Sequence, residues 1–277
     1  MFAINIGALA EPAALVEASK HAEACGIESL WTGEHVVLPD PQAPPSPLPP
    51  HTPILDPAIA LALAAGVTSR IKLATGIIIL PQRNPVVLAK ELASLDVICG
   101  GRFIFGIGVG YLEPEFRAIG ASFDEKGRRA MEYLAAMRSL WSDEAPAFDG
   151  SFVRFSGVQQ KPRPLQNPLP VVFGGHSRPA YRRALEVAQG WYGFSLDHEQ
   201  TAACLGEIAA LRDEVERPAE LGPLEITITP PAGSLPDADQ LARYAELGVD
   251  RVVPMPLAGN AADYCAAIDQ VVAAAPR

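Results

Sequence analysis

A glutamate and a histidine, Glu34 and His35, stand side by side directly after the apolar segment Ser29–Gly33. Histidine exchanges protons near neutral pH, so His35 is a candidate general acid or base. Glu34 would then orient the imidazole or raise its pKa. Neighbouring residues at a strand end point in opposite directions, so we expect one side chain to face a pocket and the other to support it. The alternative is a purely structural pair that fixes a loop.

The sequence GGHSRP at positions 174–179 is a second candidate site, because it follows an apolar segment and opens a predicted helix. Free backbone N–H groups at a helix start, a hydroxyl and a guanidinium together favour an anion such as a phosphate. The residues predicted to take part are Gly174, Gly175, His176, Ser177 and Arg178. The alternative is a capped helix with Ser177 at the N-cap and Pro179 in the first turn, and the two interpretations are compatible.

Gly76 interrupts the apolar segment Ile71–Ile79, between Thr75 and Ile77. Glycine inside a strand usually marks a bulge or a place where another backbone or a ligand comes close. Thr75, Gly76 and Ile77 are therefore candidates for contact with a bound group. The alternative is a tight packing contact within the sheet.

Gly108 and Gly110 stand at the end of the segment Phe103–Val109, directly before Tyr111. Ligands approach parallel sheets at the C-terminal ends of the strands, so we expect a ring or a substrate to come close here. A dinucleotide-binding G-x-G-x-x-G motif is excluded, because it would require glycine where Tyr111 stands. We expect a long polar segment, and no immediate helix, after Tyr111.

Eight strand-like segments alternate with eight helical ones. The predicted strands are Phe2–Gly7, Ser29–Gly33, Ile71–Ile79, Phe103–Val109, Val171–Gly174, Gly190–Phe194, Leu224–Thr229 and Arg251–Met255. The predicted helices are Glu11–Cys25, Pro57–Ser69, Pro85–Cys99, Asp124–Trp141, Arg178–Gln189, Asp197–Val215, Asp237–Leu247 and Ala261–Ala274. Repeated strand–helix units predict a parallel sheet with right-handed crossovers, and eight of them predict a (β/α)₈ barrel with its active site at the C-terminal mouth.

Two insertions interrupt this alternation, one after the second strand and one before the fifth. Pro39–Pro57 contains nine prolines and is either a stiff surface loop or a lid over the mouth. Ala145–Pro170 contains the sequence FDGSFVRFSG, which predicts an inserted hairpin with an Asp149-Gly150 turn.

Composition limits the classes of protein and partner. The chain has 277 residues, 49% of them hydrophobic, which suits one barrel domain spanning 1–277. A formal net charge of −10 argues against nucleic acid or an acidic membrane as the main partner. No signal peptide or run of ~20 apolar residues is expected, and four cysteines without a C-x-x-C pair predict reduced thiols in the cytoplasm. A metal site is not expected, because there is no H-E-x-x-H motif and the other histidines have no ligand spacing relative to His35.

The motifs WTGEH, LATGIIILPQRNP, LAKELASLD, GGRFIFGIGVGY, FDGSFVRF and QNPLPVVFGGHS follow one another in this order. Together they resemble the bacterial luciferase-like superfamily of flavin and deazaflavin oxidoreductases, and most of all its branch that uses coenzyme F420. The resemblance covers roughly residues 1–195. Members near this branch often have tryptophan where this chain has Tyr111, and some have a catalytic carboxylate there.

The resemblance implies a (β/α)₈ barrel, usually a homodimer, with an isoalloxazine-like ring in the mouth. It implies a bulge at Thr75, Gly76 and Ile77 with a cis peptide bond before a non-proline residue, supporting the ring from behind. It places His35 at the reacting face. The implied activity is hydride transfer between F420 and a small organic substrate; the alternatives are a two-component monooxygenase that uses reduced FMN, and a flavin-binding barrel without catalysis.

Overall fold

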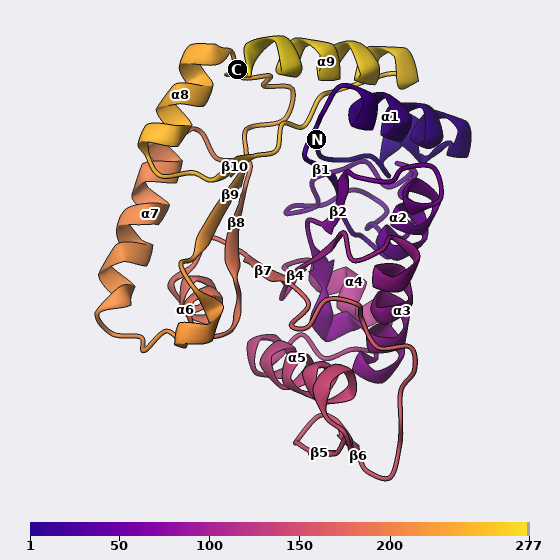
Figure 1. Ribbon diagram of the computed structural model, residues 1–277, viewed down its shortest axis with the longest axis vertical. Coiled ribbons are helices and arrows are strands. Elements are labelled where there is room, and N and C mark those ends of the chain that lie inside the picture. Colours follow the sequence, from indigo (N-terminus) through magenta and orange to yellow (C-terminus); the bar gives the residue numbers. More distant parts are fainter. Residues whose placement is uncertain (276–277) are drawn as a thin grey trace.

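The computed structural model describes residues 1–275, which form a curled parallel sheet surrounded by helices (Figure 1). The sheet order is β1-β2-β4-β7-β8-β9-β10, with the short β3 also paired to β4. The strands are β1 (Ser29–Thr32), β2 (Lys72–Thr75), β3 (Ile78–Ile79), β4 (Phe103–Gly108), β7 (Val171–Gly174), β8 (Gly190–Phe194), β9 (Glu225–Thr229) and β10 (Arg251–Val252). The pairs in this sheet are all parallel, which confirms the predicted α/β barrel architecture.

All eight predicted helices are present, and polar caps begin several of them. Asp56 and Asn84 each accept two backbone N–H bonds before a proline at the first helical position, and Asp197 and Asp237 form capping boxes. The helices are α1 (Pro12–Ala24), α2 (Pro57–Ala65), α3 (Pro85–Ile98), α4 (Glu113–Ala118), α5 (Lys126–Ser142), α6 (Arg178–Val187), α7 (His198–Arg212), α8 (Ala238–Glu246) and α9 (Ala261–Ala274). None of them has the length and apolarity needed to cross a bilayer, within the described residues.

The prediction of a first strand over Phe2–Gly7 is wrong, because this segment does not form a regular strand. Ala3 has a φ of 63°, a left-handed conformation that breaks the strand ladder. The segment nevertheless closes the barrel, because Phe2 N–H donates to the Pro254 carbonyl at 3.0 Å and Trp31 N–H donates to the Met1 carbonyl at 2.8 Å. The predicted last strand is also shortened, to β10.

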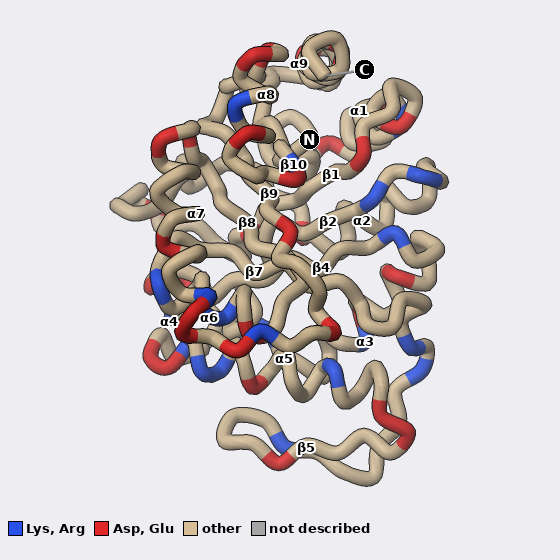
Figure 2. The backbone as a smooth tube through the Cα atoms, turned by 60° about the vertical axis from the view of Figure 1, so that its left-hand side comes forward, with Lys and Arg blue, Asp and Glu red and all other residues tan. Residues whose placement is uncertain are grey.

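Two apolar cores hold the barrel together. Phe2, Trp31, Ile104, Val172 and Tyr192 belong to the cluster inside the sheet, where the rings of Trp31 and Tyr192 stack at 5.2 Å. The larger cluster packs the outer face of the sheet against the helices. Charged residues lie mainly on the outer helices and loops (Figure 2). This distribution follows from the cost of burying charge without a partner.

Both predicted insertions are confirmed, and one helix was not predicted. The segment between β1 and α2 has no helix and only an isolated bridge between Ile54 and Ile6. Strands β5 (Phe148–Asp149) and β6 (Arg154–Phe155) form the hairpin that projects at the bottom of Figure 1. The expectation of a long polar segment after Tyr111 is wrong, because α4 begins two residues later.

Candidate active site

A bulge interrupts the third predicted strand at the expected place. Ala74 pairs with Ile104 and Ile78 pairs with Ile107, so the three residues 75–77 face only the two residues 105–106. The peptide bond between Gly76 and Ile77 is cis, as the resemblance implied. Thr75 fixes the bulge: its hydroxyl accepts from Gly106 N–H at 2.9 Å and donates to the Gly106 carbonyl at 2.7 Å. The Thr75 hydroxyl is therefore used within the sheet.

The side chain of Ile77 lies across the glycines at the ends of two neighbouring strands. A Cβ on Gly108 would stand 2.4 Å from Ile77 Cδ1, and a Cβ on Gly174 would stand 3.0 Å from Ile77 Cγ2. A side chain at Gly108 or Gly174 would therefore displace Ile77, which packs on the backbone of both glycines. Ile77 itself is only partly buried, so it presents an apolar surface above β4 and β7.

Gly110 has a different role from Gly108. Its φ is 74°, and a Cβ there would stand 2.6 Å from Ile79 and 2.8 Å from Phe116. Gly110 therefore permits a turn and the close packing of α4 against the strand end. This turn brings the residues after β4 next to those after β1.

His35 lies between two residues that follow β4. Its Nδ1 is 3.4 Å from Glu115 Oε2, and its Nε2 is 3.5 Å from the Tyr111 hydroxyl. Glu115 is fully buried, whereas Tyr111 is 49% exposed. Burial, and then the charge of Glu115, raise the pKa of Tyr111, so its hydroxyl stays protonated at neutral pH. The three side chains form a chain of proton-carrying groups from the interior to the surface.

Glu34 does not contact this chain, which corrects the expectation that it orients His35. Its buried carboxylate accepts hydrogen bonds from Ile79 N–H and from the guanidinium of Arg83, with Arg83 Nε at 2.9 Å. Arg83 also contacts Asp56 at 2.6 Å. Burial opposes the charge on Arg83, but Glu34 and Asp56 raise its pKa above the ordinary value. Glu34 therefore ties the long loop and the bulge region together.

The segment 174–178 lies at the start of α6, as predicted. Gly175 has a φ of 125°. His176 Nε2 accepts the Phe194 N–H at 3.0 Å, and burial lowers its pKa, so this histidine is neutral. Ser177 is the N-cap residue, but its hydroxyl makes no capping bond within residues 1–275. Arg178 contacts Glu214 at 2.5 Å. The hydroxyl and first-turn N–H groups are thus better placed for an anion than the guanidinium, which is already paired.

Exposed apolar side chains follow the C-terminal ends of four strands. They are Val36 and Val37 after β1, Tyr111 after β4, Phe194 at the end of β8 and Leu257 after β10. Gln82, which follows β3, has both side-chain polar atoms buried without a partner among the described residues. An apolar rim with unpaired polar groups is typical of a small-molecule site.

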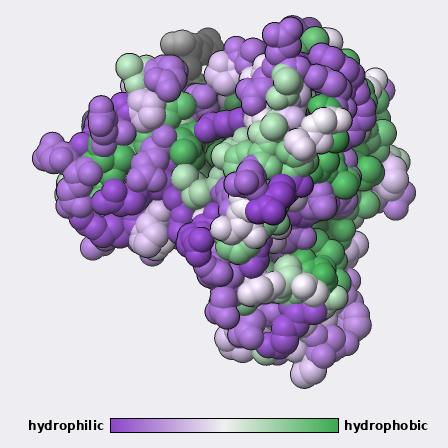
Figure 3. Space-filling model, turned by 90° about the horizontal axis from the view of Figure 1, so that it is seen from below, coloured by the Kyte–Doolittle hydropathy of each residue, from purple (hydrophilic) through white to green (hydrophobic). Residues whose placement is uncertain are grey.

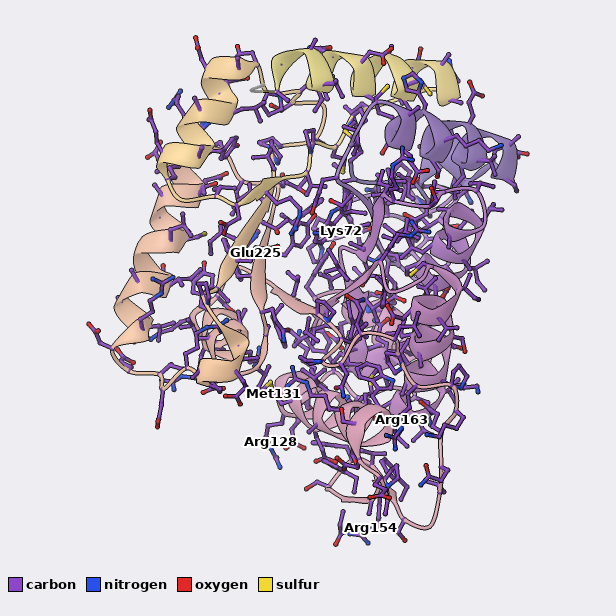
Figure 4. The ribbon with its side chains drawn as sticks, viewed as in Figure 1. Lys72, Arg128, Met131, Arg154, Arg163 and Glu225 are labelled. Atoms are coloured by element: carbon purple, nitrogen blue, oxygen red, sulfur yellow. The ribbon has the colours of Figure 1, made fainter. Side chains whose placement is uncertain are left out.

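Two cavities lie away from these residues. A groove of about 300 Å³ between α5, the hairpin and α6 is lined by Arg128 and Met131, which lie close together in Figure 4. A cavity of about 180 Å³ at the N-terminal ends of the strands is lined by Lys72 and Glu225. On the face nearest the hairpin, apolar side chains occur in several patches among polar ones (Figure 3).

Glu115, the buried carboxylate beside His35, was not predicted from the sequence. It lies on α4, a helix that was not predicted from the sequence. The resemblance pointed to a carboxylate at position 111 itself in some relatives, where this chain has Tyr111, so it gave no signal for Glu115. Three predicted residues, His35, Tyr111 and Ile77, remain at the mouth with side chains partly open to solvent.

Comparison with known proteins gives the same family for nearly the whole chain. The family model for luciferase-like monooxygenase matches residues 3–269. An uncharacterized protein of Mycobacterium tuberculosis is 32% identical over 249 residues, covering 85% of this chain and 84% of its own length. The FMNH(2)-dependent dimethylsulfone monooxygenase of Pseudomonas putida is 38% identical over 112 residues, covering 39% of this chain and 31% of its own length.

Solved structures support the fold. The coenzyme F420 dependent tetrahydromethanopterin reductase of Methanopyrus kandleri aligns with a TM-score of 0.74 at 18% identity, over 95% of this chain and 94% of that chain. With the family match over residues 3–269, the barrel, the bulge and the glycine-lined mouth lead to one conclusion: this chain is a member of the luciferase-like monooxygenase family of oxidoreductases.

Proposed function

We propose that this protein is an F420-dependent oxidoreductase that exchanges a hydride with a small organic substrate at the C-terminal mouth of the barrel. The observation that carries the proposal is the group Glu115, His35 and Tyr111, which provides a protonated hydroxyl and an imidazole beside the bulge strand. Hydride addition to a carbonyl or a similar bond requires such a proton donor.

The residues at the mouth fit a deazaflavin or flavin. Ile77 offers an apolar surface for a ring. Because Gly108 and Gly174 have no side chains, Ile77 can lie directly on the backbone at the ends of β4 and β7. The Ser177 hydroxyl, which makes no capping bond in the described part of the chain, and the first N–H groups of α6 suit a phosphate. The side-chain amide of Gln82, which has no partner among the described residues, could bond a polar ring edge. The bound cofactor supplies or accepts the hydride; the protein supplies orientation, water exclusion and the proton.

The proton path follows from the contacts. The Tyr111 hydroxyl is the most exposed member and is placed to hand its proton to a developing oxyanion. With both ring nitrogens protonated, His35 passes its Nε2 proton over 3.5 Å to Tyr111 as the tyrosine gives up its own. The ring then regains a proton from solvent, and the buried Glu115 carboxylate accepts the hydrogen bond from Nδ1. Such hydrogen bonds are often long before substrate is bound and shorten in the complex. The exposed side chains of Val36 and Val37 after β1 offer an apolar contact for the substrate.

A second candidate, a monooxygenase that uses reduced FMN and oxygen, is favoured by one observation. The match to the dimethylsulfone monooxygenase reaches 38% identity, although over only 112 residues. The two functions differ in whether oxygen is consumed.

We also propose that the protein is a homodimer, because Ile59 on α2 and Val87 on α3 expose apolar side chains on two helices that pack together.

Turnover with and without oxygen tests the proposed function. Reduced F420 is mixed with a panel of aldehydes, ketones and conjugated enones under nitrogen, and its reoxidation is followed by absorbance. The proposal predicts reoxidation without oxygen by at least one class of substrate. Substrate conversion that requires both reduced FMN and oxygen, with none from reduced F420, would instead establish the monooxygenase.

A further inference from the structure

A histidine and a cysteine on the first helix meet an aspartate on the last helix, near the other end of the sequence. His21 and Cys25 are four residues apart on α1 and so share one face of that helix. Asp269 lies on α9, 244 positions after Cys25. The two helices pack side by side at the top of Figure 1. We propose that His21, Cys25 and Asp269 bind a divalent metal ion of the zinc class.

The distances between the donor atoms support this assignment. His21 Nε2 lies 3.5 Å from Cys25 Sγ, and Cys25 Sγ lies 3.6 Å from Asp269 Oδ1. Tetrahedral zinc with ordinary bond lengths places a nitrogen or oxygen donor about 3.6 Å from a sulfur donor. His21 Nε2 and Asp269 Oδ1 are 2.7 Å apart, since they contact each other directly, and would part by about 0.7 Å around an ion.

The donor chemistry selects the kind of ion. Imidazole nitrogen, thiolate sulfur and carboxylate oxygen are together the ligands of zinc and similar transition ions, whereas calcium and magnesium prefer oxygen alone. Binding releases the Cys25 thiol proton to solvent, because the thiolate is the ligand, and involves no oxidation or reduction. The cysteine side chain is only partly buried, so an ion and a fourth ligand from water can reach it.

The place of the site in the fold gives it a consequence. Helices α1 and α9 flank the seam where the barrel closes through the irregular segment after Met1 rather than through a regular strand. At this seam Tyr264 on α9 donates to the Phe2 carbonyl at 2.9 Å. An ion held by both helices would join the two ends of the barrel and stabilise the folded chain by RT ln(1 + c/Kd), where c is the free ion concentration.

The alternative is that His21 and Asp269 form an ordinary exposed ion pair, with Cys25 as a bystander. Exposed pairs of this kind contribute little to stability. An ion pair makes no use of the thiol and has no affinity for metal, so the two explanations differ in what Cys25 does.

Cobalt(II) and zinc(II) binding to the full chain test the proposal. The metal-free protein is titrated with cobalt(II), and a sulfur-to-metal charge-transfer absorption is measured, together with the thermal midpoint in zinc(II). We expect one equivalent to bind, the absorption to appear and the midpoint to rise. In Cys25→Ser the absorption is lost, and in Asp269→Asn the affinity falls by roughly tenfold or more.

Cys204→Ser and Cys265→Ser are the matched controls, and both are expected to retain the absorption. Asp269 is largely exposed, so its variant keeps the fold even if Cys25→Ser is unstable. No charge-transfer absorption in the wild type, or an absorption of the same strength in Cys25→Ser, would overturn the assignment.

Discussion

The Nδ1 atom of His35 lies 3.4 Å from Oε2 of Glu115, although the two residues are 80 positions apart. The other carboxylate oxygen of Glu115 accepts the N–H of Val36 at 2.5 Å. One fully buried side chain on α4 therefore holds both the imidazole and the backbone that follows it. These two hydrogen bonds hold the His35 imidazole beside Tyr111, so the proposed proton path runs from His35 to the Tyr111 hydroxyl.

Replacing His35 with alanine removes the group that resupplies the proton to Tyr111. We expect turnover to fall by roughly 10²–10⁴, the usual contribution of a general acid or base, with nearly normal cofactor binding. Single-turnover oxidation of reduced F420 measures the effect. His51→Ala, at an exposed position in the proline-rich loop, is the matched control and should be unaffected. If His35→Ala and the wild type turn over at the same rate, the role of His35 is structural and not catalytic.

Glu115→Gln keeps the shape of the side chain and removes its charge. A hydrogen bond to a charged group contributes about 1.5–3 kcal/mol, so we expect turnover to fall by roughly ten- to a hundredfold. Glu113→Gln is the control, since Glu113 lies on the same helix and is exposed, with its contact to Arg117 at 2.8 Å. If both variants lose activity to the same extent, the effect belongs to the helix and not to the carboxylate beside His35.

The sequence was informative where a local pattern determines structure. Glycine inside an apolar segment predicted the bulge at Gly76, and the helix predicted to begin at Pro85 is α3. Ala3 was missed because a left-handed alanine depends on tertiary contacts that no local pattern records. Glu115 was missed because its partner is distant in the chain, and Glu34 was assigned the wrong partner because Arg83 is brought to it only by the fold.

Gly108→Ala tests the packing beneath the proposed ring. The new Cβ would stand 2.4 Å from Ile77 Cδ1, so the isoleucine must move and the apolar surface is displaced. Overpacking of this kind costs about 1–3 kcal/mol. We expect lower stability and weaker cofactor binding, measured by denaturant unfolding and by fluorescence titration. The double variant with Ile77→Ala should recover stability; a double variant that is less stable than Gly108→Ala would contradict the packing argument.

Glu23 provides a pH dependence that is independent of the active site. Partial burial opposes its charge, but hydrogen bonds from the backbone of Ile71, Arg70 and Ser69 and from the Ser69 hydroxyl lower its pKa from 4.5 to about 2. A lowered pKa means that this stabilisation is complete above about pH 4.5 and is lost as the pH falls towards 2.

Glu23→Gln should therefore destabilise the protein by about 1 kcal/mol at pH 7, because an amide group would face backbone N–H donors. The difference from the wild type should narrow below pH 4.5, as measured by denaturant midpoints across the pH range. The exposed Glu17→Gln on the same helix is the control and should show no such trend. If the stability difference between Glu23→Gln and the wild type stays constant from pH 7 to pH 3, the charge of Glu23 is not responsible for it.

Fluorescence titration of the purified protein with oxidised F420 and, separately, with FMN tests the central proposal most directly. The proposal predicts saturable binding of both the wild type and His35→Ala to F420, with a lower Kd for F420 than for FMN. Ser177→Ala should weaken F420 binding by roughly three- to tenfold, because the Ser177 hydroxyl is proposed to donate a hydrogen bond to the phosphate. Binding of FMN as tight as that of F420, or tighter, would contradict the proposed cofactor.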